Sequence, residues 1–208
     1  MLGPRLFPAV GARYRALFVD LGKLVEHLPE LRDVHHVLDI GGGDGAVLDV
    51  ILERQRTLRA TLLDLAANVG WAIRPELLSR VTLLPATGIR AYIDSDREVP
   101  DLVVVSDVLH HVPAGQRLAF LRDVRGVLKG RRGTIAIKDV EPGHWRATLG
   151  YWSDRYVTGD RDVRLIGLAE LLALAAEAFP GAVIERTGLR QADPPNYCVW
   201  IQVAAAPA

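Results

Sequence analysis

The chain has 208 residues, of which 50% are hydrophobic and 24% charged, so it can bury a full core and is not a disordered chain. Basic and acidic residues balance at 25 each, and the net charge therefore gives no reason to expect nucleic acid or a membrane surface as a partner. Cys198 is the only cysteine, which excludes an internal disulfide, and no stretch reaches the roughly 18 apolar residues of a membrane span. We expect a soluble, cytoplasmic protein, either a monomer or a homodimer.

Hydrophobic spacing predicts alternating helices and strands along the chain. Apolar side chains at intervals of three and four predict an amphipathic helix over residues 10–28, which Pro29 ends. The next elements are predicted as a strand over 34–40, a helix over 44–53, a strand over 58–65, a helical region over 66–79 broken at Pro75, and a short strand over 81–84. After them come a β-branched strand over 101–106, a helix from Pro113 to Leu128, and a strand over 133–140.

The end of the chain departs from this simple alternation. Residues 141–164 are rich in aromatic and charged side chains, and we expect a helical lid there. A helix over 168–179 follows, and strands over 183–189 and 197–203 flank a Pro-Pro-Asn turn, which suggests an antiparallel pair. Strands joined by helices imply a mostly parallel sheet covered on both faces. The predicted fold class is α/β, a three-layer sandwich whose seven-stranded, mostly parallel sheet ends in that pair, with residues 1–208 as a single domain.

The segment most informative about function is residues 37–45, Val-Leu-Asp-Ile-Gly-Gly-Gly-Asp-Gly, between the first predicted strand and the next helix. Gly41, Gly43 and Gly45 leave this turn without side chains, so that a nucleoside cofactor can lie against bare backbone. Asp64 ends the second predicted strand, 19 residues after Gly45, where a carboxylate can accept hydrogen bonds from ribose hydroxyls. Together the two features predict a nucleoside-cofactor site.

Two cofactor classes satisfy this pattern. Gly41-x-Gly43-x-x-Ala46 fits the loose dinucleotide fingerprint, so NAD has to be weighed. Against NAD, Asp39 precedes the first glycine by two positions, which suits a cofactor end with an ammonium group better than one with a pyrophosphate. A third glycine at position 45 and the terminal antiparallel pair also depart from the dinucleotide pattern.

Three motifs carry a family resemblance. These motifs are the segment 39–45, Asp64, and the segment Ser-Asp-Val-Leu-His-His at 106–111. They resemble the motifs of the class I S-adenosylmethionine-dependent methyltransferases, which have a Rossmann-like fold. The resemblance covers about residues 34–140, and Leu-His-His is similar to that of small-molecule enzymes such as the quinone methyltransferases and many from bacterial secondary metabolism. It implies S-adenosylmethionine as the cofactor and S-adenosylhomocysteine as the product.

The resemblance also implies roles for individual residues. The three glycines would let the cofactor approach, Asp39 would lie near its methionine amino group, and Asp64 would bind its ribose hydroxyls. Leu65 would pack on the adenine. Thr87 stands where the family often has an acid that meets the adenine amino group, and its hydroxyl could accept the same hydrogen bond more weakly.

Methyl transfer is an in-line displacement, which mainly requires alignment of acceptor, carbon and sulfur. Asp107 and Val108 would line the methyl-transfer face by the same resemblance. A hydroxyl acceptor must also lose a proton, and the candidate bases are His111 first and His110 second, at the carboxyl edge of the sheet. Alternatively, one of these histidines caps the following helix or bonds in the core. His144, on the loop after the fifth strand, is a third candidate or a surface residue.

Further candidates concern the acceptor. Asp139 ends the fifth strand and could orient a histidine, bind a polar acceptor group, or form a salt bridge with an arginine. Four aromatic residues could form an apolar lid over a ring-shaped acceptor, or simply pack the lid on the sheet: Tyr14, Trp145, Tyr151 and Trp152. No metal is expected, because no three ligands converge by spacing. The expected partner is a small-molecule acceptor.

The function predicted from the sequence is S-adenosylmethionine-dependent methyl transfer to a small molecule, at a hydroxyl of an aromatic or polyketide-like secondary metabolite. Nitrogen and carbon acceptors remain open. One alternative is a protein of the same fold that binds the cofactor but carries out non-methyl chemistry, such as cyclisation, or regulation. Another is an NAD-dependent oxidoreductase.

Overall fold

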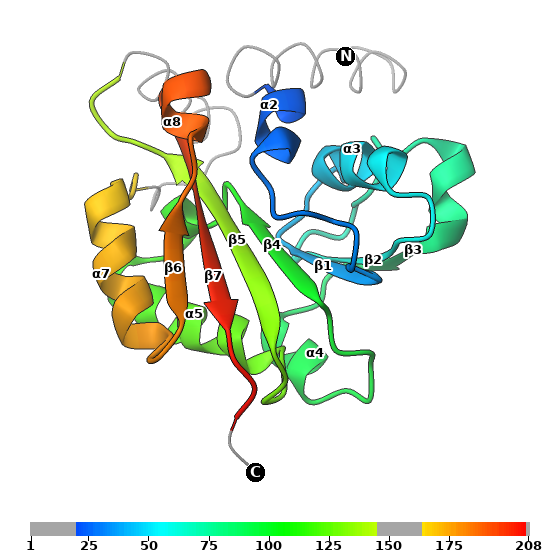
Figure 1. Ribbon diagram of the computed structural model, residues 1–208. Coiled ribbons are helices and arrows are strands. Elements are labelled where there is room, and N and C mark those ends of the chain that lie inside the picture. The colour runs from blue at the N-terminus through cyan, green and yellow to red at the C-terminus, as the bar shows by residue number, and fades with distance from the viewer. Residues whose placement is uncertain (1–19, 145–163, 207–208) are drawn as a thin grey trace.

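The computed structural model describes residues 20–144 and 164–206, whose strands form one seven-stranded sheet (Figure 1). The strands are β1 (His36–Ile40), β2 (Arg59–Leu63), β3 (Val81–Leu84), β4 (Leu102–Ser106), β5 (Gly133–Val140), β6 (Val183–Arg186) and β7 (Asn196–Val203). Their order in the sheet is β3-β2-β1-β4-β5-β7-β6. The first five strands pair in parallel, whereas β7 runs antiparallel to β5 and β6. The predicted mostly parallel sheet with an antiparallel C-terminal pair is confirmed.

Helices cover both faces of this sheet, which gives the three predicted layers (Figure 1). One face carries α2 (Leu21–Glu26), α3 (Ala46–Arg54) and α8 (Leu189–Ala192), and the other carries α4 (Ile89–Ile93), α5 (Arg117–Gly126) and α7 (Leu168–Ala178). Val104 and Val105 of β4 are adjacent in sequence but belong to opposite cores, because successive side chains of a strand point to opposite faces. Both faces are therefore buried, which explains why β4 reads as an unbroken apolar run.

The segment 66–79 was predicted as a broken helix, and that prediction is wrong for its first part. Residues 66–74 form no helix, and a 3₁₀ helix, η1, covers Pro75–Arg80. The physical reason is a competing set of hydrogen bonds. The amide of Gly70 donates to the carbonyl of Gly43 at 2.9 Å, and that of Ala72 donates to the carbonyl of Asp44 at 2.9 Å. The backbone groups that a helix would use are therefore bound to the glycine turn.

Other boundaries differ on a smaller scale. Of the helix predicted over 10–28, residues 10–19 lie outside the described residues, and α2 ends at Glu26, two residues before the predicted end. Asp20 is the N-cap of α2 and accepts from the amide of Lys23. Short 3₁₀ helices η2 (Leu109–His111) and η3 (Ala114–Gln116) precede α5, and α4 and α8 were not predicted. The proposed lid over 141–164 falls almost entirely outside the described residues. Among the helices of the described segments, none is long and apolar enough to cross a membrane.

Candidate active site

A cavity of about 550 Å³ lies at the edge of the sheet where β1, β2 and β4 end. Seven of the residues predicted for the site line it: Gly41, Asp64, Leu65, Thr87, Asp107, Val108 and His111. Leu65 is 78% exposed at this cavity, so its apolar surface is available to a ligand. Segments far apart in sequence thus meet in one hollow, as expected for ligand sites at the carboxyl edge of such sheets.

The surroundings of the three predicted glycines differ in whether they leave room for a side chain. Gly41 and Gly45 have positive φ, and an added Cβ would lie 2.5 Å from Val108 and from Ile73, respectively. These two positions are therefore required by the packing of the protein itself. At Gly43, with φ +52°, an added Cβ would meet nothing within 4 Å among the described residues. The approach of a cofactor to all three glycines stays a prediction, and Gly43 is the one whose added Cβ would meet open space among the described residues.

Asp64 braces the glycine turn from the end of β2. One carboxylate oxygen accepts from the amide of Gly43 and the other from the amide of Ala66, each at 2.8 Å. The amide of Thr87 donates to the carbonyl of Asp64 at 2.9 Å, and the Thr87 hydroxyl donates to the carbonyl of Pro85 at 2.8 Å. Asp64 and Thr87 are thus held at the cavity wall by hydrogen bonds, and Asp64 is partly engaged before any ligand arrives.

Asp39 lies beneath the glycine turn rather than on the cavity wall. Its side chain is 1% exposed, and neither carboxylate oxygen has a hydrogen-bond partner among the described residues. An added Cβ at Gly42 would lie 2.5 Å from one of these oxygens, so the carboxylate packs directly against the turn. Burial, and then the charge of Asp64, raise the pKa of Asp39 to about 7. A cation near the buried carboxylate of Asp39 and the half-buried carboxylate of Asp64 would stabilise both.

The two adjacent histidines occupy different environments. His110 is buried, and its Nδ1 lies 2.8 Å from Oδ1 of Asp139, which also accepts from the amide of Val140 at 2.8 Å. His111 is exposed and borders the cavity, with its ring centroid 4.2 Å from that of His110. Of the roles considered for Asp139, the orientation of a histidine is the one that the structure bears out.

Of the other residues predicted for catalysis or for the acceptor, only some lie within the described segments. His144 is half-buried on the loop after β5 and does not line the cavity. The four candidate lid aromatics lie outside the described residues: Tyr14, Trp145, Tyr151 and Trp152.

Lys138 is a site residue that the sequence reasoning missed. It lies in β5, is 3% exposed, and its Nζ contacts the two carboxylate oxygens of Asp107 at 2.6 and 2.7 Å. Partial burial favours the neutral form of Asp107, but Lys138 and then His110 outweigh it, so the pKa of Asp107 is lowered. A signal existed in the sequence, since Lys138 is one of only three lysines and interrupts an apolar strand.

Asp107, His110 and Asp139 place three potential metal-ligand atoms within 4.8 Å of one another. The ammonium of Lys138 already contacts both oxygens of Asp107, so a divalent cation would have to displace it. The arrangement is an ion-pair network in which Lys138 supplies the positive charge.

The cavity also has an apolar wall that was not predicted. Ile89, at the start of α4, and Phe120 of α5 line it, together with Arg90. The guanidinium of Arg90 is paired with Asp123 at 2.6 Å. A five-residue helix such as α4 gives too short a pattern to be recognised in the sequence.

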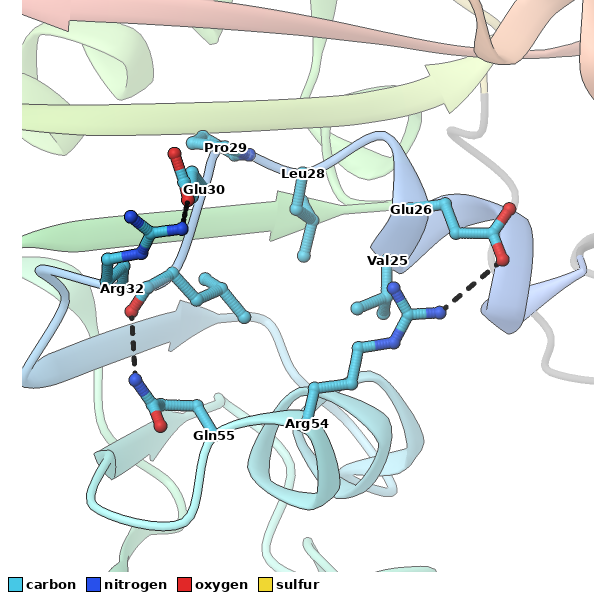
Figure 2. Close-up of a pocket in the computed structure, with 9 residues that line it drawn as sticks. Val25, Glu26, Leu28, Pro29, Glu30, Arg32, Arg54 and Gln55 are labelled. Carbon is cyan, nitrogen blue, oxygen red and sulfur yellow. Dashed lines mark hydrogen bonds and ion pairs between the residues drawn. The ribbon is translucent and has the colours of Figure 1, made fainter.

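A second cavity, of about 490 Å³, lies between α2, the following loop and the end of α3 (Figure 2). Its charged and polar side chains are engaged locally. Arg54 pairs with Glu26 at 3.7 Å, Arg32 pairs with Glu30 at 2.9 Å, and Gln55 donates to the carbonyl of Leu31 at 3.3 Å. None of the predicted site residues within 20–144 lines it.

Comparisons with known proteins agree with this geometry. Residues 38–134 match the family described as Methyltransferase domain. The chain is 30% identical over 145 residues to Polyamine aminopropyltransferase 2 of Pseudomonas aeruginosa, an alignment that covers 63% of the chain and 39% of that protein. It is 28% identical to TnmH, with a TM-score of 0.68, over 95% of the chain and 57% of TnmH.

A further solved structure, the O-methyltransferase NcsB1 from neocarzinostatin biosynthesis, is 22% identical with a TM-score of 0.65. It was solved with S-adenosyl-L-homocysteine and 1,4-dihydroxy-2-naphthoic acid, and the match covers 96% of the chain and 59% of NcsB1. The chain therefore spans less than two thirds of the length of each of these relatives. The family match supports the resemblance to methyltransferases over residues 38–134, and the solved structures show the same fold.

Proposed function

We propose that the protein transfers a methyl group from S-adenosylmethionine to a hydroxyl of a small aromatic or polyketide-like acceptor. The observation that carries this proposal is the cavity at the carboxyl edge of the sheet, where Asp64, Asp107 and His111 meet the glycine turn. That turn lies within the segment that matches the methyltransferase family.

The residues present fit this cofactor. The buried carboxylate of Asp39 has no hydrogen-bond partner among the described residues and lies near a second carboxylate, Asp64, which suits a ligand with positive charge. The open position at Gly43 leaves backbone accessible, and the apolar side chains of Leu65 and Phe120 suit an adenine ring. When bound, S-adenosylmethionine supplies the methyl group on a positively charged sulfur.

His110 is the residue that we propose as the base, in preference to His111. A general base works best when a third group orients it, and Asp139 does this at 2.8 Å from the Nδ1 of His110. As the base, the imidazole of His110 would take the proton of the acceptor hydroxyl. His111 borders the cavity where the cofactor is proposed to lie, and its role would be to shape that site.

The choice of an aromatic hydroxyl is supported by one relative. NcsB1 was solved with a dihydroxynaphthoic acid, a ring that carries acidic hydroxyl groups. This compound is therefore the first acceptor to test.

The cofactor is tested by calorimetry with S-adenosylmethionine and, separately, with NAD. Binding of NAD alone would replace the proposal with an oxidoreductase. Transfer is tested by incubation with S-adenosylmethionine and a panel of phenols that begins with 1,4-dihydroxy-2-naphthoic acid. Formation of S-adenosylhomocysteine together with a product one methyl group heavier supports the proposal. Tight cofactor binding without turnover on any phenol favours the alternative of non-methyl chemistry or regulation.

The role of the base is tested with three variants. His110→Ala and Asp139→Asn should each lower turnover by about 100-fold or more, the usual contribution of general-base catalysis, with cofactor affinity nearly unchanged. His111→Ala should weaken cofactor binding and leave the pH dependence of turnover intact. If only His111→Ala abolishes turnover while the cofactor still binds, His111 is the base and the assignment to His110 is wrong.

A further inference from the structure

Beside the cavity, β4 and β5 bring three charged side chains and a histidine into one cluster. Asp107 follows β4, Lys138 and Asp139 end β5, and His110 lies in η2 between them. Potential ligand atoms of Asp107, His110 and Asp139 lie within 4.8 Å of one another. His110 therefore has two carboxylates as close neighbours, but only one of them, Asp139, bonds to its Nδ1.

Lys138 holds the second carboxylate through both its side chain and its main chain. Its Nζ contacts both oxygens of Asp107, and its carbonyl accepts from the Asp107 amide at 3.0 Å. Asp107 has a φ of +58°, a conformation that is rare for residues other than glycine, so these contacts also stabilise an unusual backbone. The next residue, Val108, then packs against Gly41 at the cavity wall.

The two partners of this ion pair differ in exposure. The Asp107 side chain is 37% exposed and lines the cavity, whereas the Lys138 side chain is 3% exposed and lies behind it. A buried ammonium is costly unless it is paired, so the pair is expected to stay closed. Lys138 thus cancels the charge of one of the two carboxylates next to His110, Asp107, while Asp139 keeps its contact with the His110 ring.

We propose that Lys138 is a positioning residue that, by neutralising Asp107, sets the pH at which His110 releases its proton and becomes able to act as a base. This inference rests on the proposed function only where it says that deprotonated His110 acts as the base. The protonation of His110 itself is a property of the protein without cofactor or acceptor. Without Lys138, two carboxylates would stabilise the imidazolium, and His110 would stay protonated to higher pH.

The other titratable groups around the cluster are few among the described residues. His111 stacks obliquely beside His110, and Tyr197 of β7 lies opposite Asp139 in the sheet register. Tyr197 donates its hydroxyl to the carbonyl of Ile166 at 2.7 Å, and burial raises its pKa, so it stays neutral. The guanidinium of Arg117 donates to the backbone carbonyl of Arg164 and is paired with Glu170 at 2.8 Å. The backbone amide of Arg164 in turn donates to the backbone carbonyl of His110. None of these groups bonds to Asp107 in the described residues, so Lys138 is the group that controls its charge.

The test is an NMR titration of the histidine side chains in the whole protein without cofactor. The chain has six histidines, and the signal of His110 is identified by its loss in His110→Gln. Lys138→Met should raise the midpoint of the His110 titration by about one pH unit or more, the usual effect of an uncompensated charge at this range. Asp107→Asn, which leaves the ammonium alone, should lower the midpoint. The double variant should return it close to the wild-type value.

Two further variants control for charge and for structure. Lys138→Arg keeps the positive charge and should keep the wild-type midpoint. Lys129→Met removes a lysine whose Nζ bonds only to the carbonyl of Ser95 among the described residues, and it should change nothing at His110. An unchanged His110 midpoint in Lys138→Met, with the fold intact by circular dichroism, would overturn the proposal. If Lys138→Met does not fold, Asp107→Asn and the double variant decide, and an unchanged midpoint in Asp107→Asn overturns it equally.

A parallel measurement of turnover separates this inference from the proposed function. The acidic limb of the pH–rate profile should move to higher pH in Lys138→Met by the same amount as the NMR midpoint. Should the midpoint shift while no phenol is methylated, the proposed function fails and the inference about Lys138 stands. Should methyl transfer occur with the same acidic limb in both proteins, the proposed function stands and the inference fails.

Discussion

The buried carboxylate of Asp39 should destabilise the protein when no cofactor is bound. Burial and Asp64 raise its pKa from 3.8 to about 7. Because one pKa unit corresponds to about 1.4 kcal/mol, ionised Asp39 costs the folded state about 4 kcal/mol at pH 8. Asp39→Asn keeps the shape and removes the charge, so it should increase the free energy of unfolding by up to about 4 kcal/mol at this pH.

The sign of the effect follows from the direction of the pKa change. Below pH 3.8 the carboxyl is protonated in both states, and wild type and variant should have similar stability. As the pH rises from 3.8 to 7, the unfolded chain ionises first, so wild-type stability falls relative to that of Asp39→Asn. Above pH 7 the difference should stay constant.

Urea denaturation at several pH values between 4 and 8, without cofactor, measures this difference. Asp96→Asn is the matched control, because Asp96 is exposed and its substitution should change stability little at any pH. With S-adenosylmethionine present the order should reverse, since only the wild type gains the full binding free energy. A variant that is less stable than the wild type at pH 8, or a difference that does not depend on pH, would refute the reasoning.

Three further outcomes are expected. Gly43→Ala should lower the free energy of unfolding by about 1–2 kcal/mol because of its positive φ alone, and should weaken cofactor binding in calorimetry. Gly45→Ala should lower the free energy of unfolding clearly more in urea denaturation, because its Cβ would overlap a core side chain. Arg117→Met removes a fully buried guanidinium that binds two carbonyls and a carboxylate, so it should lower the free energy of unfolding by about 3–5 kcal/mol. Arg122→Met, which breaks an exposed ion pair, should lower it by less than about 1 kcal/mol. Cys198 should resist iodoacetamide at pH 8 in the native protein and react on unfolding, because burial raises the pKa of its thiol to about 12. Rapid alkylation of the native protein would contradict that last expectation.

The parts of the fold that the sequence predicted well are those set by local patterns. The strands over 81–84 and 133–140 have the predicted bounds, because each is an apolar run that ends at turn-forming or charged residues. The glycine turn and Asp64 were also placed correctly, since a turn with positive φ between a strand and a helix leaves a clear signature.

The errors arose where distant residues decide. Residues 66–74 carry a helical pattern, but the amides of Gly70 and Ala72 bond to the glycine turn, which no local window reveals. Which of His110 and His111 is the base stays a prediction, but the contact of His110 with Asp139, 29 residues later in the chain, is one that no local window reveals. Lys138 was overlooked because a lysine in an apolar strand becomes informative only when its partner, Asp107, is placed directly after the adjacent strand, β4.

The position of β7 has a consequence for the nascent chain. β7 is the last of the seven strands to leave the ribosome, yet it is inserted between β5 and β6. Until residue 203 has emerged, β5 keeps an unpaired edge and β6 has no neighbour in the sheet. The sheet can therefore close only after β7 has been synthesised, and until then the unpaired edge of β5 can pair with other chains.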